Sequence, residues 1–197
     1  QSLIDFRPPP GIRPPVEQPL TIALLTIAAL VGLAIALSLR DALQVLHQMR
    51  ERSTTDGMTG LLNRTTFDDR AERLFESAGR QPICLVLFDI DHFKRINDTC
   101  GHLSGDRVIA RLGQLIGDHG VADAVAGRIG GEEFAVLFKG TSLSAGRLFA
   151  EAIRARFAAS DLGEDISWTV TLSAGLAVRD EDENLPSLIA RADKALY

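Results

Sequence analysis

Residues 125–138 read VAGRIGGEEFAVLF. Two short apolar runs, residues 125–129 and 134–138, lie on either side of a glycine pair and an acid pair, which predicts a β-hairpin with charge at its tip. Gly130 and Gly131 carry no Cβ, so the backbone can turn tightly and a large ligand can approach it. Glu132 and Glu133 then present two carboxylates that suit a hard cation such as Mg²⁺, which in turn suits phosphate chemistry.

A second acidic segment follows a buried strand. Residues 83–88 read ICLVLF, a continuous apolar run that is typical of a central strand, and Asp89, Ile90 and Asp91 come next. A carboxylate at the end of such a strand has a fixed position and is well placed to hold a metal. Together the two acidic segments could hold one or two metal ions, as in two-metal nucleotidyl transfer. Alternatively, the aspartates cap the next turn and the glutamates form a solvated hairpin tip.

The remaining pattern alternates helices and strands. Helical periodicity covers residues 65–77, 106–117, 144–159 and 185–197, and a strand pattern covers residues 167–178. This order predicts an α+β sandwich in which helices pack on a largely antiparallel sheet. We expect Trp168 and the phenylalanines to lie in its core.

The first 55 residues have a different composition. Residues 1–19 are rich in proline, which predicts an extended extramembrane segment. Residues 20–39 contain no charged residue and match the ~20 residues of a transmembrane helix. A buried helix of a soluble protein and a cleaved signal peptide are the alternatives. From Leu39 onward, leucines spaced by four and three (Leu39, Leu43 and Leu46) favour, over residues 40–55, a juxtamembrane signalling helix that dimerises as a coiled coil, or a helix that packs on its own domain.

Charge and cysteine content narrow the possible partners. The 197 residues carry a net charge of −5, so the overall balance gives no reason to expect nucleic acid as a partner. Cys84 lies in the buried strand and Cys100 in the following loop, and two cysteines in these settings do not make a disulfide framework. They are compatible with the reducing cytosol.

Five segments carry a resemblance to a known family. Residues 89–106 read DIDHFKRINDTCGHLSGD, and together with residues 130–134 they closely resemble the catalytic domain of GGDEF-type diguanylate cyclases. Residues 56–64 (DGMTGLLNR), 171–175 (TLSAG) and 192–197 (ADKALY) resemble the entry motif, late strand and last helix of that family, in the same order. The resemblance covers residues 53–197 and implies a GGDEF domain over 56–197. The implied fold is the ferredoxin-like, polymerase-palm-like sandwich of nucleotidyl cyclases.

The resemblance also implies an activity. Family members condense two GTP into cyclic di-GMP and pyrophosphate, with one GTP per subunit and the active site completed across a homodimer. The implied metal ligands, for Mg²⁺ or Mn²⁺, are Asp89, Glu132 and the Ile90 carbonyl. The implied catalytic residues are Glu132, Glu133 and Lys94, with Glu133 either a second metal ligand or part of the base system. The implied substrate-binding residues are Asn97, His102, Asp106 and Lys94.

The chemistry of these side chains agrees with the implied roles. The N1 and N2 donors of guanine suit an aspartate such as Asp106, and its O6 acceptor suits the amide of Asn97. Lys94 suits a phosphate as a mobile point charge. Each residue also has a structural alternative: Asn97 in a turn, Asp106 as the cap of a helix beginning near Arg107, His102 in a structural hydrogen bond, and Lys94 on the surface.

The resemblance has consequences for location and length. Because GTP is cytosolic, we expect a single-pass protein of the inner (cytoplasmic) membrane, crossing at residues 20–39 with its catalytic domain in the cytoplasm. The last helix of the family continues beyond the position of Tyr197 to a lysine and an arginine that reach phosphates. We therefore expect the domain to be truncated at its C-terminal end.

The sequence also bears on product inhibition and on alternative functions. Many members carry an inhibitory product site, Arg-x-x-Asp, before the glycine pair. Here Gly120 stands three residues before Asp123, so no arginine can grip a phosphate there, and we expect weak or no product inhibition. A catalytically impaired GTP-binding module that signals by protein contact is the alternative function. An adenylate-type cyclase is a further one, although Asn97 and Asp106 favour guanine over adenine.

Overall fold

A computed structural model of the chain describes residues 18–51, 54–119 and 123–196. The chain divides into two compact units, Gln1–Arg52 and Ser53–Tyr197. The described part of the first unit is one helix, α1 (Gln18–Glu51). The helices expected over 20–39 and 40–55 are therefore continuous through Glu51, whereas Thr54 and Thr55 lie outside any helix. Of the leucines expected to form a coiled coil, Leu43 and Leu46 have side chains outside the described ones.

The apolar part of α1 has the length and composition of a membrane-crossing helix. Ile22–Asp41 spans 20 residues with a mean hydropathy of 2.6, and none of its residues is buried within the chain. The hydroxyl of Thr26 donates to the carbonyls of Ile22 and Ala23 at 3.0 and 2.8 Å. This hydroxyl therefore finds its partners within the helix, as an apolar environment requires.

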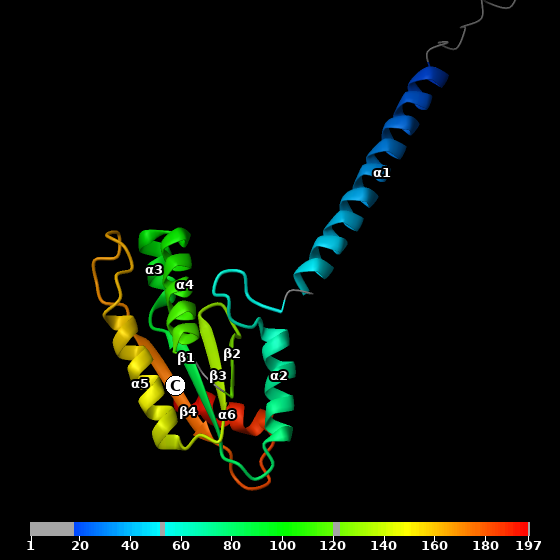
Figure 1. Cartoon of the computed structure of the whole chain (residues 1–197). Coiled ribbons are helices and arrows are strands. Elements are labelled where there is room, and N and C mark those ends of the chain that lie inside the picture. Colours follow the sequence, from blue (N-terminus) through cyan, green and yellow to red (C-terminus); the bar gives the residue numbers. More distant parts are fainter. Residues whose placement is uncertain (1–17, 52–53, 120–122, 197) are drawn as a thin grey trace, which may run out of the picture. The chain divides into compact units, whose positions relative to one another are not determined.

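The second unit is built on one antiparallel sheet. Among the described residues its strands are β1 (Ile83–Ile90), β2 (Ala124–Arg128), β3 (Glu133–Lys139) and β4 (Leu172–Val178), in the order β2-β3-β1-β4 (Figure 1). Every neighbouring pair is antiparallel. Helices connect β1 to β2 and β3 to β4, so each connected pair encloses a third strand. This is ferredoxin-like topology, and the α+β prediction is confirmed.

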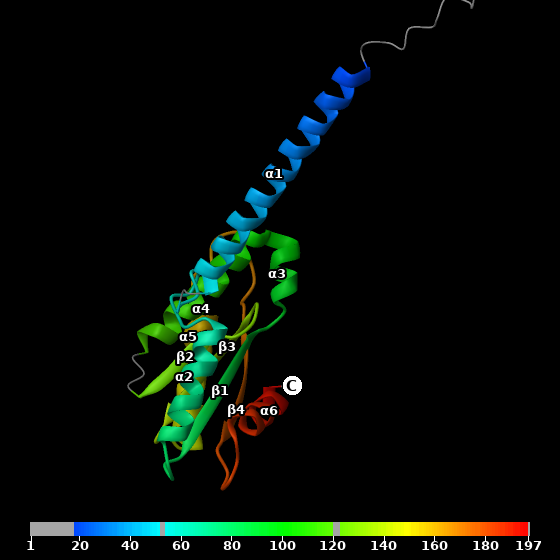
Figure 2. The same ribbon diagram turned by 90° about the vertical axis from the view of Figure 1, so that its right-hand side faces the viewer.

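Helices cover both faces of this sheet. Helices α4 (His102–Asp118) and α5 (Leu143–Ala158) pack on one face, and α2 (Arg64–Ser77) and α6 (Leu185–Leu196) pack on the other (Figures 1 and 2). Val86 and Phe88 belong to the first core, and Leu85 and Leu87 belong to the second. Successive strand residues alternate between the faces, which is why β1 reads as an uninterrupted apolar run.

Several boundaries differ from the sequence-based prediction. A helix that was not expected, α3 (Phe93–Cys100), precedes α4, so Cys100 ends a helix rather than lying in a loop. Gly101 has a φ of 83° and separates the two helices. Because α4 begins at His102, Asp106 lies inside that helix. The structural alternative, in which Asp106 caps a helix that begins near Arg107, was therefore wrong. Strand β4 begins only at Leu172. The eight residues of α3 bury fully only Ile96, which is too little periodicity to indicate a helix.

Helix α6 approaches the sheet closely at Gly175 (Figure 2). A Cβ at this position would lie 2.2 Å from the Ala192 carbonyl oxygen and 2.7 Å from the Leu196 nitrogen. Both are main-chain atoms, so the helix would have to shift. We expect Gly175→Ala to reduce the free energy of unfolding of residues 53–197 by about 1–3 kcal/mol, measured by urea denaturation.

Gly117→Ala is the matched control for this substitution. Gly117 lies in α4, and the nearest atom to an added Cβ is 3.9 Å away. Alanine is favoured over glycine in a helix, so this variant should be about 0.5–1 kcal/mol more stable than the original chain. Unchanged stability in Gly175→Ala would contradict close packing of α6 on β4.

Candidate functional site

The predicted acidic residues meet at the end of the sheet where β1 finishes and β3 begins. The strand register places Asp89 directly opposite Glu133 on β3 and opposite Ser173 on β4. Both carboxylates are half-buried. Residues directly opposite on antiparallel strands have Cβ atoms about 4.5–5.5 Å apart, and like charges there repel. A cation between or beside these carboxylates would relieve that repulsion.

The glycine turn leaves one open side and one closed side. The Ile129 N–H donates to the Glu133 carbonyl at 2.9 Å and closes the turn. A Cβ on Gly130 would lie 2.2 Å from Glu133 Oε2, so the glutamate side chain folds over this glycine. Gly131 has no atom within 4 Å of an added Cβ. A ligand therefore has room to approach the backbone at Gly131, as the sequence predicted, with Glu132 next to it.

Arg128 fixes the glycine turn by hydrogen bonds to its backbone, a role that sequence analysis missed. Its guanidinium donates to the Gly130 carbonyl at 3.2 Å and to the Gly131 carbonyl at 2.7 Å. The same group forms an ion pair with Asp56 at 3.2 Å, and only 16% and 23% of the two side chains are exposed. Arg128 thus joins the glycine turn to the segment that precedes α2. The available signal was a charged residue within an apolar strand, two positions before the turn.

Asp56 is itself held in its charged form. Burial alone would raise the pKa of this carboxyl, but hydrogen bonds from the hydroxyl and amide of Thr59 and the nearby Arg128 lower the pKa below its usual value of 3.8. The Thr59 hydroxyl donates to Asp56 at 2.8 Å and its amide donates at 2.9 Å. The Asp56–Arg128 pair is therefore ionised at neutral pH.

Asp91 has a structural role. Its carboxylate accepts hydrogen bonds from the hydroxyls of Thr171 and Ser173, the latter at 2.6 Å, and its N–H donates to the Thr171 carbonyl at 3.0 Å. These bonds fasten the end of β1 to the start of β4. Asp91 is thus used in joining β1 to β4, whereas the helix that follows has His92 at its N-cap and no side-chain capping bond.

Two helices bring together the residues expected to bind the base. Asn97 lies on α3 and Asp106 lies on α4, with Gly101 between the helices. A Cβ on Gly105 would lie 2.1 Å from Asn97 Oδ1, so the amide packs against the helix backbone immediately before Asp106. The chain passes from β1 directly into this pair of helices (Figure 2). Asn97 and Asp106 are consequently neighbours in space as well as in the motif.

The other two predicted residues lie on the same helices. Lys94 is in the first turn of α3 and His102 is the first residue of α4, and both are exposed. No hydrogen bond or ion pair of His102 supports the structural alternative among those described. Lys94 and His102 are thus free to meet a ligand from the side of the helix pair.

The donor set fits a magnesium-type ion that is shared with a phosphate. Among the described side chains, which are those of residues 22–41, 54–119 and 123–196, no group of three acidic, histidine or cysteine side chains is arranged to hold a metal. Mg²⁺ usually takes one or two carboxylates and completes its octahedron with water and substrate oxygens. The carboxylates of Asp89 and Glu132 and the Ile90 carbonyl are oxygen donors of this kind.

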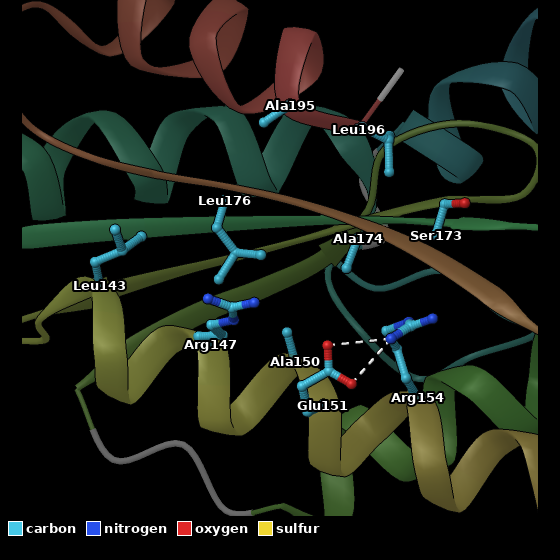
Figure 3. A pocket seen from close by; sticks show the side chains of 10 residues that line it. All are labelled: Leu143, Arg147, Ala150, Glu151, Arg154, Ser173, Ala174, Leu176, Ala195 and Leu196. Carbon is cyan, nitrogen blue, oxygen red and sulfur yellow. Dashed lines mark hydrogen bonds and ion pairs between the residues drawn. The ribbon is translucent and has the colours of Figure 1, made fainter.

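A pocket of about 430 Å³ lies elsewhere, between α5, β4 and the end of α6 (Figure 3). In it, Arg154 pairs with Glu151 at 2.9 Å and donates to the Leu172 carbonyl at 2.8 Å. Arg147 and Ser173 also line the pocket. None of the predicted site residues lines this pocket.

This fold, with a glycine-turn acidic site at the end of its sheet, matches known proteins. Residues 53–197 match the family described as Diguanylate cyclase, GGDEF domain. The chain therefore belongs to the GGDEF diguanylate cyclase domain family.

Individual relatives agree with this assignment. Diguanylate cyclase DgcP of Pseudomonas aeruginosa is 42% identical over 77% of the chain and 23% of the relative. Diguanylate cyclase VdcA of Vibrio cholerae is 36% identical over 77% of the chain and 45% of the relative. The chain thus spans less than half the length of these curated relatives.

Solved structures share the fold. The GGDEF domain of DgcB from Caulobacter crescentus, in complex with c-di-GMP, has a TM-score of 0.69 and 41% identity, covering 73% of this chain and 85% of that one. The active GGEEF domain of a diguanylate cyclase from Vibrio cholerae has a TM-score of 0.66 and 34% identity, covering 70% of this chain and 89% of that one.

Proposed function

We propose that this chain is the catalytic and membrane-anchoring part of a diguanylate cyclase, which condenses two GTP into cyclic di-GMP and two pyrophosphates. The observation that carries the proposal is the position of Asp89 opposite Glu133, beside the open glycine turn and next to the helices that bear Asn97 and Asp106. The family and the names of the relatives support it.

The residues have complementary roles in this proposal. Asn97 and Asp106 orient the guanine, and Lys94 places positive charge beside the phosphates, with His102 next to the substrate. Each 3′-hydroxyl attacks the α-phosphorus of the other GTP, and pyrophosphate leaves. Glu133 is positioned at the sheet end to accept the hydroxyl proton. A Mg²⁺ or Mn²⁺ ion held by Asp89, Glu132 and the Ile90 carbonyl would neutralise phosphate charge.

Two subunits are needed for this reaction. One domain presents one glycine turn and one Asn97–Asp106 pair, so it holds one GTP. Two such sites must face each other for each 3′-hydroxyl to reach the other α-phosphorus, which a symmetric homodimer provides. Positioning and electrostatic stabilisation supply most of the rate in such a transfer.

A GTP-binding module that signals by protein contact is the second candidate. Both candidates bind GTP, so they differ only in whether the bound GTP is converted to cyclic di-GMP.

The test is incubation of the purified chain with GTP and Mg²⁺, with nucleotides separated by chromatography. Cyclic di-GMP and pyrophosphate in a 1:2 ratio, with no product from ATP, would support the cyclase. GTP that stays bound and unconverted at concentrations where the chain is dimeric would favour the binding module. Cyclic AMP formed from ATP would contradict both candidates.

We further propose that α1 crosses the inner membrane once at Ile22–Asp41 and leaves the catalytic domain in the cytoplasm, where GTP is found. The span is uncharged apart from its last two residues, Arg40 and Asp41. Removal of residues 1–41 should release the protein from membranes into the supernatant after carbonate washing. An arginine at Leu30 costs about 2.5–3.5 kcal/mol of insertion free energy, so Leu30→Arg should weaken retention, whereas Leu30→Ile should not. Equal retention of the deleted and full-length chains would contradict the anchor.

A further inference from the structure

The loop of residues 159–171, between α5 and β4, lies against the α3–α4 pair (Figures 1 and 2). In it, the Asp165 carboxylate accepts hydrogen bonds from the Ser104 hydroxyl and the Arg107 guanidinium. Ser104 and Arg107 are one turn apart on α4. The Cys100 thiol, at the end of α3, donates to the Asp165 carbonyl at 3.1 Å. One loop residue thus contacts both helices at their junction.

Further contacts near Asp165 fix the conformation of the loop. Ser104 is a buried polar residue with 2% exposure, and its hydroxyl can donate to the Asp165 carboxylate or, at 2.8 Å, to the Cys100 carbonyl, while it accepts a hydrogen bond from Arg107 at 3.2 Å. Arg107 also donates through Nε to the Leu162 carbonyl at 3.3 Å. Gly163 has a φ of 105°, and a Cβ there would lie 2.8 Å from Asp165 Oδ1 and 3.0 Å from Arg107 Nη2. A side chain at position 163 would therefore push into the ion pair.

A second contact fastens the loop to α3. The Arg95 guanidinium lies over the ring of Trp168, 5.0 Å from its centroid. Arg95 is one residue after Lys94 and two before Asn97, on the same short helix. The loop therefore holds α3 by a cation–π contact and α4 by an ion pair.

The residues that Asp165 holds flank the proposed base-binding position. Ser104 and Arg107 lie on either side of Gly105 and Asp106, and Gly105 packs on the Asn97 amide. A shift of the first turns of α4 would thus move Asp106 relative to Asn97. Helix α3 has only eight residues, and a helix this short depends on tertiary packing for its stability and its position.

We propose that Asp165 is a positioning residue for guanine recognition: by holding Ser104 and Arg107, it sets the distance between Asp106 and the Asn97 amide. It does not touch the nucleotide and acts through α4. The inference rests on the proposed function, which assigns Asn97 and Asp106 to the base.

The test uses the full chain in detergent and compares Asp165→Ala with Glu164→Gln. Glu164 is the adjacent exposed carboxylate of the same loop. Dissociation constants are measured for GTP and for ITP, which lacks the 2-amino group of guanine, and amide hydrogen exchange is followed along the chain. We expect Asp165→Ala to weaken GTP binding about tenfold and ITP binding much less, because a misplaced Asp106 no longer meets the 2-amino group. Exchange should rise in residues 93–107, and Glu164→Gln should leave all three quantities unchanged.

A second pair of variants avoids any change of charge. Gly163→Ala should reproduce the loss of GTP-over-ITP preference, because the added Cβ meets the Asp165–Arg107 pair. Gly140→Ala is its control: Gly140 has a similarly positive φ of 70°, but no atom lies within 4 Å of an added Cβ.

Two results would overturn the proposal, and a third would leave hydrogen exchange as its test. Asp165→Ala with the original GTP and ITP affinities would overturn it. Equal weakening for both nucleotides, with faster exchange throughout the domain, would also overturn it, since that describes a general loss of stability. If the unmodified chain binds neither nucleotide, the proposed function fails. Exchange alone then decides the role of Asp165: an increase confined to residues 93–107 supports positioning of the helix pair, and no increase contradicts it.

Discussion

Asp89→Asn is expected to reduce cyclic di-GMP synthesis by about 10²- to 10³-fold, as loss of a group that stabilises transition-state charge does in other enzymes. The substitution keeps the shape of the side chain and removes its charge at the end of β1, opposite Glu133. Glu132→Gln should have an effect of the same size. Initial rates of product formation at saturating GTP measure both variants.

Controls separate a metal role from a loss of fold. Asp98→Asn removes an exposed carboxylate from α3, close in sequence to the site, and should leave the rate unchanged. If Asp89 holds the ion, Asp89→Asn should also require a higher Mn²⁺ concentration for half-maximal rate, which a general loss of stability would not produce. Full activity of Asp89→Asn would contradict the metal assignment.

Arg128→Ala is expected to lower both stability and turnover. The variant leaves the Gly130 and Gly131 carbonyls without their guanidinium donor and leaves Asp56 charged and partly buried without its ion-pair partner. Such losses cost about 2–4 kcal/mol together, measured by urea unfolding of residues 53–197 at pH 7. The glycine turn should also lose its fixed position, so turnover should fall about 10–100-fold.

Two comparisons sharpen this prediction. Arg128→Lys keeps the charge but cannot donate to the turn and to Asp56 in a fork, so it should restore only part of the activity. Arg64→Ala removes a hydrogen bond to the Ile129 carbonyl, 3.0 Å long, and an exposed ion pair with Asp68 at 3.9 Å. Because Arg64 is largely exposed, this variant should cost no more than about 1 kcal/mol. Equal stability of Arg128→Ala and Arg64→Ala would contradict a special role for Arg128.

The stabilisation by Arg128 should depend on pH in a defined direction. The folded-state pKa of Asp56 is lowered below 3.8, so the carboxylate contributes stability that is fully present above 3.8 and is lost as pH falls through the folded-state pKa. The difference in unfolding free energy between the original chain and Arg128→Ala should therefore be constant from pH 7 to about pH 5 and should shrink below pH 3.8. A difference that grows on acidification would contradict the ion pair.

Much of the fold followed from local pattern. The apolar run of β1, the hairpin with its glycine turn and the long periodic helices were predicted to within a few residues, because burial on one or both faces determines residue type at each position. Helix α3 was missed, since its short polar sequence forms a helix only where α4 and the 159–171 loop hold it. The early start of α4 was missed for the same reason.

For the candidate site, the sequence predicted the residues but not how they are brought together. Asp89, Glu132, Asn97 and Asp106 were predicted because they belong to contiguous motifs. Their juxtaposition depends on strand register and on the close approach of Asn97 to Gly105.

The supporting residues became visible only in the folded chain. Arg128 and Asp56 are 72 positions apart, and Arg107 and Asp165 are 58 apart. Each is an ordinary charged residue in its own segment, and nothing in the local pattern pairs one with the other.

Sequence by itself thus determined the long helices and the strands, which acidic groups lie at the ends of strands and which family the motifs resemble, because these properties reside in neighbouring residues. Tertiary structure alone decided that Asp89 faces Glu133, that Asp91 bonds to Thr171 and Ser173, that Arg128 holds the glycine turn and that Asp165 lies against α4. The physical reason is range: periodicity and turn chemistry act over a few residues, whereas ion pairs and strand register join segments that only the packed sheet brings into contact.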